Sequence, residues 1–174
     1  IKIIPLAIGW TKQLALRKKI RLLDIPWDCV ERDAHDSGSY LVVLRLLRAR
    51  TIEVGRLGRI RFESGFYTYI GSAKRSLSKR IERHQRLRKK VHWHIDYLRA
   101  VAEWHAAISV LSADDLECEL ARVLRETSQK AIPAFGSSDC DCGSHLVWSE
   151  DDPLQTRFFY EFLQRFRMER LFSC

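Results

Sequence analysis

Three segments with strand-like patterning follow one another between residues 39 and 71, and this run constrains the fold more than any other feature. The segment "SYLVVLRLL" has the β-branched and aromatic content of a buried strand, and "GFYTYIG" reads as a further strand. Between them, "TIEVGRLGRIRF" has two short alternating runs around a glycine-containing turn, which predicts a hairpin over residues 51–62. Because these strands pair locally and helices are added afterwards, the pattern favours an α+β fold over a doubly wound sheet.

Helical spacing begins directly after the third strand. Leu77 and Ile81 lie one helical turn apart among charged residues, so residues 76–88 are expected to form an amphipathic basic helix. "WHIDYLRAVA" predicts a second helix, and "WHAAISVL" predicts a further strand. "SADDLECELARVLRE" opens with serine and aspartate caps and acidic residues, which predicts that a helix starts there. A Cys-rich loop then leads to a short strand, "HLVW".

Composition divides the chain into three parts. Residues 1–37 form an accessory basic segment, residues 38–149 form the core domain, and residues 150–174 form an amphipathic C-terminal helix. That helix carries aromatic residues at helical spacing: Phe158, Phe159, Phe162 and Phe166. The aromatic stripe favours docking on the core, or contact with a protein partner, over membrane binding.

Charge and cysteine content indicate which class of partner the protein binds and in which compartment it works. The chain has 30 Lys and Arg against 22 Asp and Glu, a net charge of +8, which favours a polyanionic partner such as nucleic acid. No apolar run approaches the length needed to cross a bilayer, so no membrane partner is expected. The five cysteines are odd in number and too few for a disulfide scaffold, which indicates a reducing, cytoplasmic setting.

Four separated positions together resemble the motif set of the GIY-YIG nuclease superfamily. Gly38-Ser39-Tyr40 opens one strand, Tyr69-Ile70-Gly71 closes another, Arg80 lies on the next helix and Glu117 lies on a later one. The similarity spans residues 38–149. It is greatest to a small branch with an inserted hairpin and a segment "GSSDCxCxSHL", which stands here as residues 136–146. The resemblance implies a small antiparallel sheet flanked by helices, which hydrolyses DNA phosphodiesters with one divalent metal, Mg²⁺ or Mn²⁺.

The resemblance implies a role for each of these residues. Tyr40 and Tyr69 would orient or deprotonate the attacking water, which requires that the metal and Arg80 lower the tyrosine pKa from its usual value of about 10. Arg80 would bind the phosphate, because guanidinium keeps its charge and offers fixed donors. Glu117 would supply the oxygen ligand that Mg²⁺ or Mn²⁺ prefers. Taken singly, the tyrosines suit any half-buried strand, and Arg80 suits a solvated basic face.

Helical geometry separates Glu117 from its neighbour Glu119. At about 100° per residue, Glu117 falls at the edge of the apolar stripe, whereas Glu119 falls towards the charged side. A carboxylate at the edge of a buried face needs a partner, because its burial alone is costly. This selects Glu117 as the metal ligand, with an ordinary salt bridge as the alternative.

Nucleic-acid contacts are expected around the strand that ends at Gly71. Gly71 would let the backbone turn close to a phosphate, and Ser72 would donate a hydrogen bond. The segment Tyr69 to Arg80 is one residue longer than in the better-known nucleases, so the loop over residues 71–76 must bulge or Arg80 must lie differently. Further contacts to DNA are expected from basic residues of segment 74–90: Lys74, Lys79, Arg83, His84 and Arg88.

A second cluster predicts a different metal. Cys140, Cys142 and His145 lie close together in the sequence, and Cys118 projects from a charged helix face, which is unusual for a free cysteine. If the Cys-rich loop folds over that face, these four residues would supply the N/S ligands of a structural Zn²⁺ site. The alternative is a reduced and packed Cys-rich loop.

The sequence therefore supports two functional hypotheses. The first is a metal-dependent DNA endonuclease that acts on branched, damaged or other DNA. The second is a catalytically inactive nucleic-acid-binding module of the same fold.

Overall fold

The computed structural model describes residues 3–4, 36–112, 114–128 and 130–171. Most of the predicted accessory segment, residues 1–37, lies outside the described residues. In chain order, the elements are β1 (Ile3–Ile4), β2 (Gly38–Leu46), β3 (Arg50–Glu53), β4 (Arg59–Phe62), β5 (Gly65–Ala73), α3 (Leu77–Gln85), α4 (His94–Arg99), β6 (Glu103–Leu111), α5 (Glu117–Thr127), β7 (Lys130–Ala131), β8 (Leu146–Ser149) and α6 (Arg157–Leu171).

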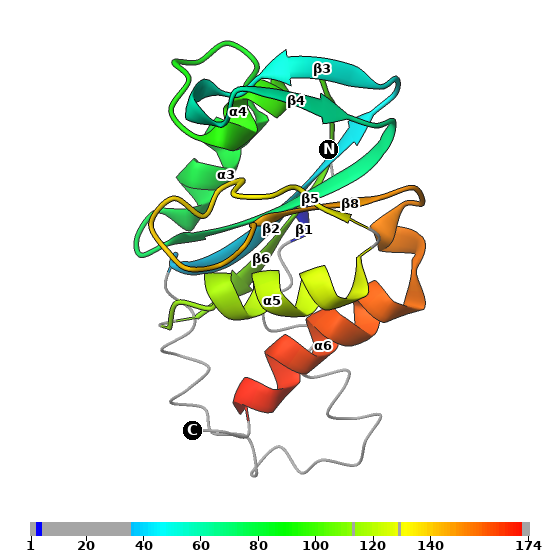
Figure 1. Ribbon diagram of the computed structural model, residues 1–174. Coiled ribbons are helices and arrows are strands. Elements are labelled where there is room, and N and C mark those ends of the chain that lie inside the picture. The colour runs from blue at the N-terminus through cyan, green and yellow to red at the C-terminus, as the bar shows by residue number, and fades with distance from the viewer. Residues whose placement is uncertain (1–2, 5–35, 113, 129, 172–174) are drawn as a thin grey trace.

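One six-stranded sheet forms the centre of the protein, in the order β1-β6-β2-β5-β8-β7. All of its pairs are antiparallel except that of the two-residue strand β1 with β6. The predicted hairpin is confirmed as the separate pair β3–β4. The structure therefore confirms the predicted α+β fold, an antiparallel sheet flanked by helices (Figure 1).

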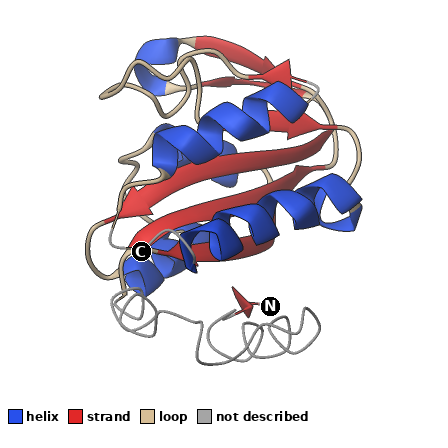
Figure 2. Ribbon diagram, turned by 90° about the horizontal axis from the view of Figure 1, so that it is seen from below, coloured by secondary structure: helices blue, strands red, loops and turns tan. Residues whose placement is uncertain are grey.

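The two faces of the sheet are covered by different elements. The first core cluster contains Tyr40, Val42 and Tyr69, together with buried residues of α3 and α4 and of the β3–β4 hairpin. These elements lie above the sheet in Figure 1. Alternation along the strands turns the intervening residues, such as Leu41 and Ile70, to the opposite face, where they pack against α5 and α6. These two helices lie side by side when the molecule is seen from below (Figure 2).

Helix α6 is part of the second core cluster. Phe159, Phe162 and Phe166 are buried there, so the aromatic stripe docks on the sheet. Phe158 and Tyr160 on the same helix remain 41% and 52% exposed. Contact of this helix with a protein partner stays a prediction.

The helices are shorter than the sequence pattern predicts. Helix α3 ends at Gln85, before the predicted end at residue 88, and α6 begins at Arg157 and not at residue 150. Helix α4 ends at Arg99, whereas the predicted segment runs on to Ala102. Helix α5 begins at Glu117, and not at the serine and aspartates that were expected to cap it. The Ser112 hydroxyl instead accepts a hydrogen bond from the Asp114 N–H, in a turn that precedes the helix. No helix among the described residues combines the length and apolar character that a bilayer span requires.

Candidate active site and metal centre

The edge of β5 is open where the candidate site lies. Strand β8 pairs with β5 only as far as Tyr69, and one more hydrogen bond joins the Ile70 N–H to the His145 carbonyl. Beyond this point Gly71 and Ser72 have no neighbouring strand on the β8 side in the described part of the chain. Side chains from both faces of the sheet can therefore meet at this edge.

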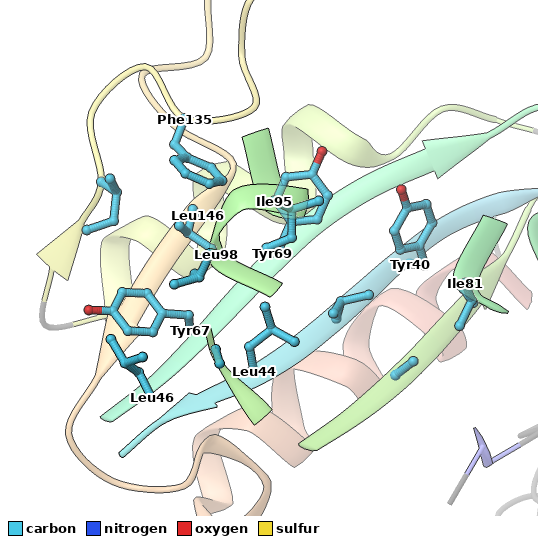
Figure 3. Close-up of a cluster of buried hydrophobic side chains, with 14 of the residues drawn as sticks. Tyr40, Leu44, Leu46, Tyr67, Tyr69, Ile81, Ile95, Leu98, Phe135 and Leu146 are labelled. Carbon is cyan, nitrogen blue, oxygen red and sulfur yellow. The ribbon is translucent and has the colours of Figure 1, made fainter. Parts of the chain in front are cut away.

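A cavity of about 350 Å³ lies at this edge. Its lining includes all four residues that the GIY-YIG resemblance selects, Tyr40, Tyr69, Arg80 and Glu117. These residues come from β2, β5, α3 and α5, so segments far apart in the sequence build one polar pocket. Figure 3 shows Tyr40 and Tyr69 on the same face of neighbouring strands.

The other residues predicted to contact nucleic acid differ in exposure. Gly71 and Ser72 line the same pocket. Lys74, Lys79 and Arg88 are exposed and do not line the pocket. Arg83 is partly buried and His84 is buried.

Gly71 is needed for close packing rather than for a turn. The residue lies inside β5, directly opposite Tyr40 in the strand register. A Cβ atom at this position would lie 2.4 Å from the Tyr40 hydroxyl oxygen, closer than real Cβ contacts. The expected turn at Gly71 is therefore wrong, and the glycine instead makes room for the Tyr40 ring.

A left-handed residue precedes the helix that carries Arg80. Ser76 has a φ of 54°, immediately before α3. The Asp36 carboxylate accepts hydrogen bonds from the N–H and the hydroxyl of Ser78, at 2.8 and 2.7 Å. Asp36 therefore satisfies a free donor at the start of this helix, and the bulge or shift of Arg80 expected from the extra residue stays a prediction.

Trp93 supports the guanidinium groups of two arginines. The Arg80 guanidinium carbon lies 4.9 Å from the centroid of the Trp93 ring, and that of Arg83 lies 4.2 Å from it. Such cation–π contacts restrict long side chains that would otherwise be free. Trp93 lines the pocket, so it holds Arg80 at the site, a role that the sequence did not reveal.

His84 lies beneath the pocket and not on the surface. It is 1% exposed, and its Nε2 atom shares a 2.8 Å hydrogen bond with the Tyr40 hydroxyl. Direct contact with DNA is therefore blocked by burial, although His84 can act through Tyr40. Burial also lowers the pKa of His84, so the neutral imidazole is favoured at pH 7.

Asp96 completes this buried group. Its Oδ1 lies 3.8 Å from His84 Nδ1, an atom that has no hydrogen-bond partner among the described residues. A carboxylate at this distance favours the tautomer with hydrogen on Nδ1, which leaves Nε2 free to accept from Tyr40.

Asp96 is also tied to its own loop. Lys89 and Arg83 form ion pairs with it at 2.9 and 3.2 Å, and the backbone N–H groups of His92 and Trp93 donate to it. Burial alone would raise the pKa of Asp96, but the nearby His84 ring and the hydrogen bonds from Lys89, His92 and Arg83 hold it well below the usual range. Asp96 therefore remains charged beneath the site.

The tyrosine pKa values differ from the sequence-based expectation. Burial raises the pKa of Tyr40 well above its usual value, and the nearby charge of Arg80 offsets only part of that rise. Burial raises the pKa of Tyr69 in the same way. Burial therefore favours the neutral phenol at both positions, so Arg80 alone does not lower either pKa below its usual value, and a lowering by a bound metal stays a prediction.

Glu117 is held from two sides at the start of α5. Its Oε2 accepts a hydrogen bond of 2.5 Å from the Ser72 hydroxyl, and its Oε1 accepts one of 2.7 Å from His145 Nδ1. The side chain is 21% exposed and lines the pocket. A carboxylate has more acceptor sites than these two bonds use, so Glu117 fits the oxygen ligand that Mg²⁺ or Mn²⁺ requires.

Ser39 anchors the helix that carries Glu117. This serine is fully buried. Its hydroxyl accepts a hydrogen bond of 3.2 Å from the Leu116 N–H, one of the free donors at the start of α5. Ser39 therefore has a structural role in fixing the start of α5.

The four predicted N/S ligands come together beside Glu117. One donor atom from each of Cys118, Cys140, Cys142 and His145 lies within 4.8 Å of the others, an arrangement that could hold one metal ion. The Cys-rich loop folds over the exposed face of α5 as expected, and Arg125 secures it by donating to the Ser144 carbonyl at 2.8 Å. A hydrogen bond with Cys142 and burial raise the pKa of the Cys118 thiol to about 12. Three sulfurs and one imidazole suggest structural zinc.

Fold and site define an α+β protein with a polar pocket at a sheet edge and, next to it, a Cys/His cluster that could hold a metal ion. A family described as "Domain of unknown function DUF123" matches residues 39–168. The chain belongs to this family. No curated protein and no solved structure matches the chain significantly.

Proposed function

We propose that this protein is a metal-dependent endonuclease that hydrolyses DNA phosphodiester bonds in the pocket at the β5 edge. The supporting observation is the meeting of Tyr40, Tyr69, Arg80 and Glu117 in one cavity, although they lie on four separate elements. DUF123 is a GIY-YIG-like, nuclease-related family, which agrees with this proposal.

The buried pair of Tyr40 and His84 gives the attacking water a route for its proton. The water transfers a proton to the Tyr40 oxygen while Tyr40 passes its own proton to His84 Nε2. The water oxygen then forms the new bond to phosphorus, and the bond to the leaving oxygen breaks. Asp96, 3.8 Å from His84 Nδ1, stabilises the imidazolium that results. This route needs no tyrosinate before the reaction, in agreement with the raised pKa of Tyr40.

Arg80 and Glu117 supply the charged groups for binding the phosphate and the metal ion. Arg80 binds the nonbridging oxygens of the scissile phosphate, with its guanidinium positioned against Trp93. Glu117 holds the divalent ion, and Mg²⁺ or Mn²⁺ bound there would stabilise negative charge on the leaving oxygen. Tyr69 packs beside His84, with ring centroids 6.0 Å apart, and its hydroxyl orients the water.

DNA would approach across the basic surface around α3. Lys74, Lys79 and Arg88 are exposed there and would contact backbone phosphates without reading sequence. Binding of this kind weakens steeply with salt, because each contact releases counterions.

The Cys/His centre has a structural part in this proposal. Cys118, Cys140, Cys142 and His145 offer four N/S donors, the number that a structural zinc site uses, so they would hold zinc without an open position for substrate. Zinc would hold the Cys-rich loop on α5, the helix that begins with Glu117.

The test is a cleavage assay on plasmid and branched DNA with Mg²⁺ or Mn²⁺. Wild type and Glu119→Gln should cut, whereas Glu117→Gln should bind the same DNA and leave it intact. Glu119 is exposed on the same helix, so its variant controls for the loss of one negative charge. Wild type that binds DNA but cuts none of the substrates would replace this proposal with an inactive nucleic-acid-binding module.

A further inference from the structure

We propose that metal bound at the Cys118, Cys140, Cys142 and His145 centre fixes the carboxylate of Glu117 through the His145 ring. His145 is then a positioning residue for the neighbouring pocket as well as a metal ligand. The consequence for catalysis rests on the function proposed above, but the coupling itself is a property of the metal centre.

The His145 ring joins the two sites directly. Its Nε2 atom lies 3.4 Å from Cys140 Sγ, and its Nδ1 atom lies 2.7 Å from Glu117 Oε1. The side chain is only 2% exposed, so packing holds the ring between these two partners. One planar group therefore spans the distance from the thiols to the pocket.

The Glu117 carboxylate determines which nitrogen carries the hydrogen. An ionised carboxylate can only accept hydrogen bonds, so His145 Nδ1 must be the donor. The lone pair of a neutral ring is then on Nε2, which faces the thiols. This is the tautomer that a metal needs at Nε2, and a carboxylate partner makes such a ligand more basic.

The second oxygen of the same carboxylate is fixed from the sheet. Ser72 donates to Glu117 Oε2 from the open end of β5. The carboxylate is thus held between a strand and the metal-binding loop, and rotation of the His145 ring would release one of its two anchors. Metal at the centre prevents that rotation.

Coupling of this kind acts in both directions. If metal binding favours the hydrogen bond from His145 to Glu117, removal of the Glu117 charge must weaken metal binding by the same factor. Loss of the partner of a metal-bound histidine typically lowers metal affinity by about 10- to 100-fold.

Zinc affinity tests the inference without DNA or Mg²⁺. Zinc-loaded wild type, Glu117→Gln and Glu119→Gln are titrated against a chromogenic chelator, with circular dichroism as a check on folding. Glu117→Gln should bind zinc at least about 10-fold more weakly than wild type, and Glu119→Gln should match wild type. Equal affinity in all three proteins, or equal weakening in both variants, would overturn the proposal.

A second experiment measures how the metal centre affects ion binding in the pocket. His145→Cys keeps four metal ligands but removes the donor to Glu117, and Co²⁺ absorption shows whether the centre is still filled. The affinity of the pocket for Mn²⁺, measured by electron paramagnetic resonance, should fall in this variant. Unchanged Mn²⁺ affinity with the centre filled would contradict the coupling.

If His145→Cys does not hold Co²⁺, the same Mn²⁺ titration compares wild type with and without zinc. Weaker Mn²⁺ binding by the zinc-free protein supports the coupling, and equal binding contradicts it. None of these measurements depends on cleavage, so failure of the nuclease proposal and failure of the coupling give different results.

Discussion

The two faces of the central sheet are built from the same strands but bury different kinds of residues. On one face, Leu41 and Ile70 pack with aromatic and aliphatic residues of α5 and α6. On the other face, Tyr40 and Tyr69 pack over a buried histidine, with a buried aspartate beside it. Strand alternation therefore gives one face that is apolar throughout, and another that adds a buried polar group beneath the pocket to an apolar core.

This difference indicates that one face mainly stabilises the fold and that the buried polar group on the other face serves the reaction. Apolar burial stabilises a fold, whereas buried ionisable groups are costly unless they are paired, and ion pairs of this kind contribute little net stability. His84 and Asp96 are therefore better explained by the reaction in the adjoining pocket than by folding. Changes on the apolar face should reduce stability, and changes at the pocket should reduce cleavage.

The largest expected effect is on the apolar face. Phe162 is 3% exposed against the sheet, and Phe162→Ala should lower the free energy of unfolding by about 3–5 kcal/mol through lost burial and a cavity. Urea denaturation measures this change. The cleavage rate per folded molecule should stay at the wild-type value. A loss of cleavage in fully folded protein would contradict the claim that this face acts only on stability.

A slightly smaller effect is expected at the pocket. Arg80→Ala should slow cleavage by about 100- to 1,000-fold, because it removes the cation that faces the phosphate. Single-turnover kinetics at saturating DNA measure the rate. Lys79→Ala, at the exposed neighbouring position, is the matched control and should cleave almost normally. Equal rates in the two variants would show that Arg80 is only part of the basic surface.

Gly71→Ala should affect both properties. The new Cβ would meet the Tyr40 hydroxyl, so we expect a loss of about 1–3 kcal/mol in stability and a displaced Tyr40 ring with reduced cleavage. Gly143→Ala is the control, because no heavy atom lies within 4 Å of a Cβ added there. A Gly71→Ala protein with normal stability and cleavage would contradict the role assigned to this glycine.

The smallest effect concerns acid stability. The pKa of Asp96 is lower in the folded protein than its unfolded value of about 3.9, so its contribution is present above that value. The contribution is lost as pH falls below about 4 towards the folded pKa, by up to about 1.4 kcal/mol per pH unit. Urea denaturation between pH 6 and pH 3 should therefore show a shallower decline for Asp96→Asn than for wild type. Parallel curves would contradict the buried charge.

Local patterns in the sequence were sufficient to predict the main strands and helices and many of the residues that line the site. The β2 and β5 strands follow from β-branched and aromatic runs, and α3 follows from the spacing of Leu77 and Ile81. The gathering of the four candidate metal ligands was predictable because Cys118 stands on a charged helix face, where a free cysteine is unusual.

The remaining features depend on contacts between distant segments. The need for glycine at residue 71 arises only from its register opposite Tyr40. Trp93 and Asp96 act through α3, which no local pattern in their own segment reveals. The Leu116 N–H, directly before α5, donates to the Ser39 hydroxyl, 77 positions away, whereas the local pattern would start the helix at the preceding serine and aspartates.

The central claim is that the face with Tyr40 carries the reaction, whereas the face with Phe162 only stabilises the fold. The most direct test compares the single-turnover cleavage rates of Tyr40→Phe and Phe162→Leu. Both proteins are assayed with Mn²⁺ on branched DNA at a temperature where they are fully folded. Tyr40→Phe should cleave at least about 100-fold more slowly than wild type, because the proton route to His84 is lost, and Phe162→Leu should match wild type. Cleavage at the wild-type rate by Tyr40→Phe, or no cleavage by wild type itself, would contradict the account.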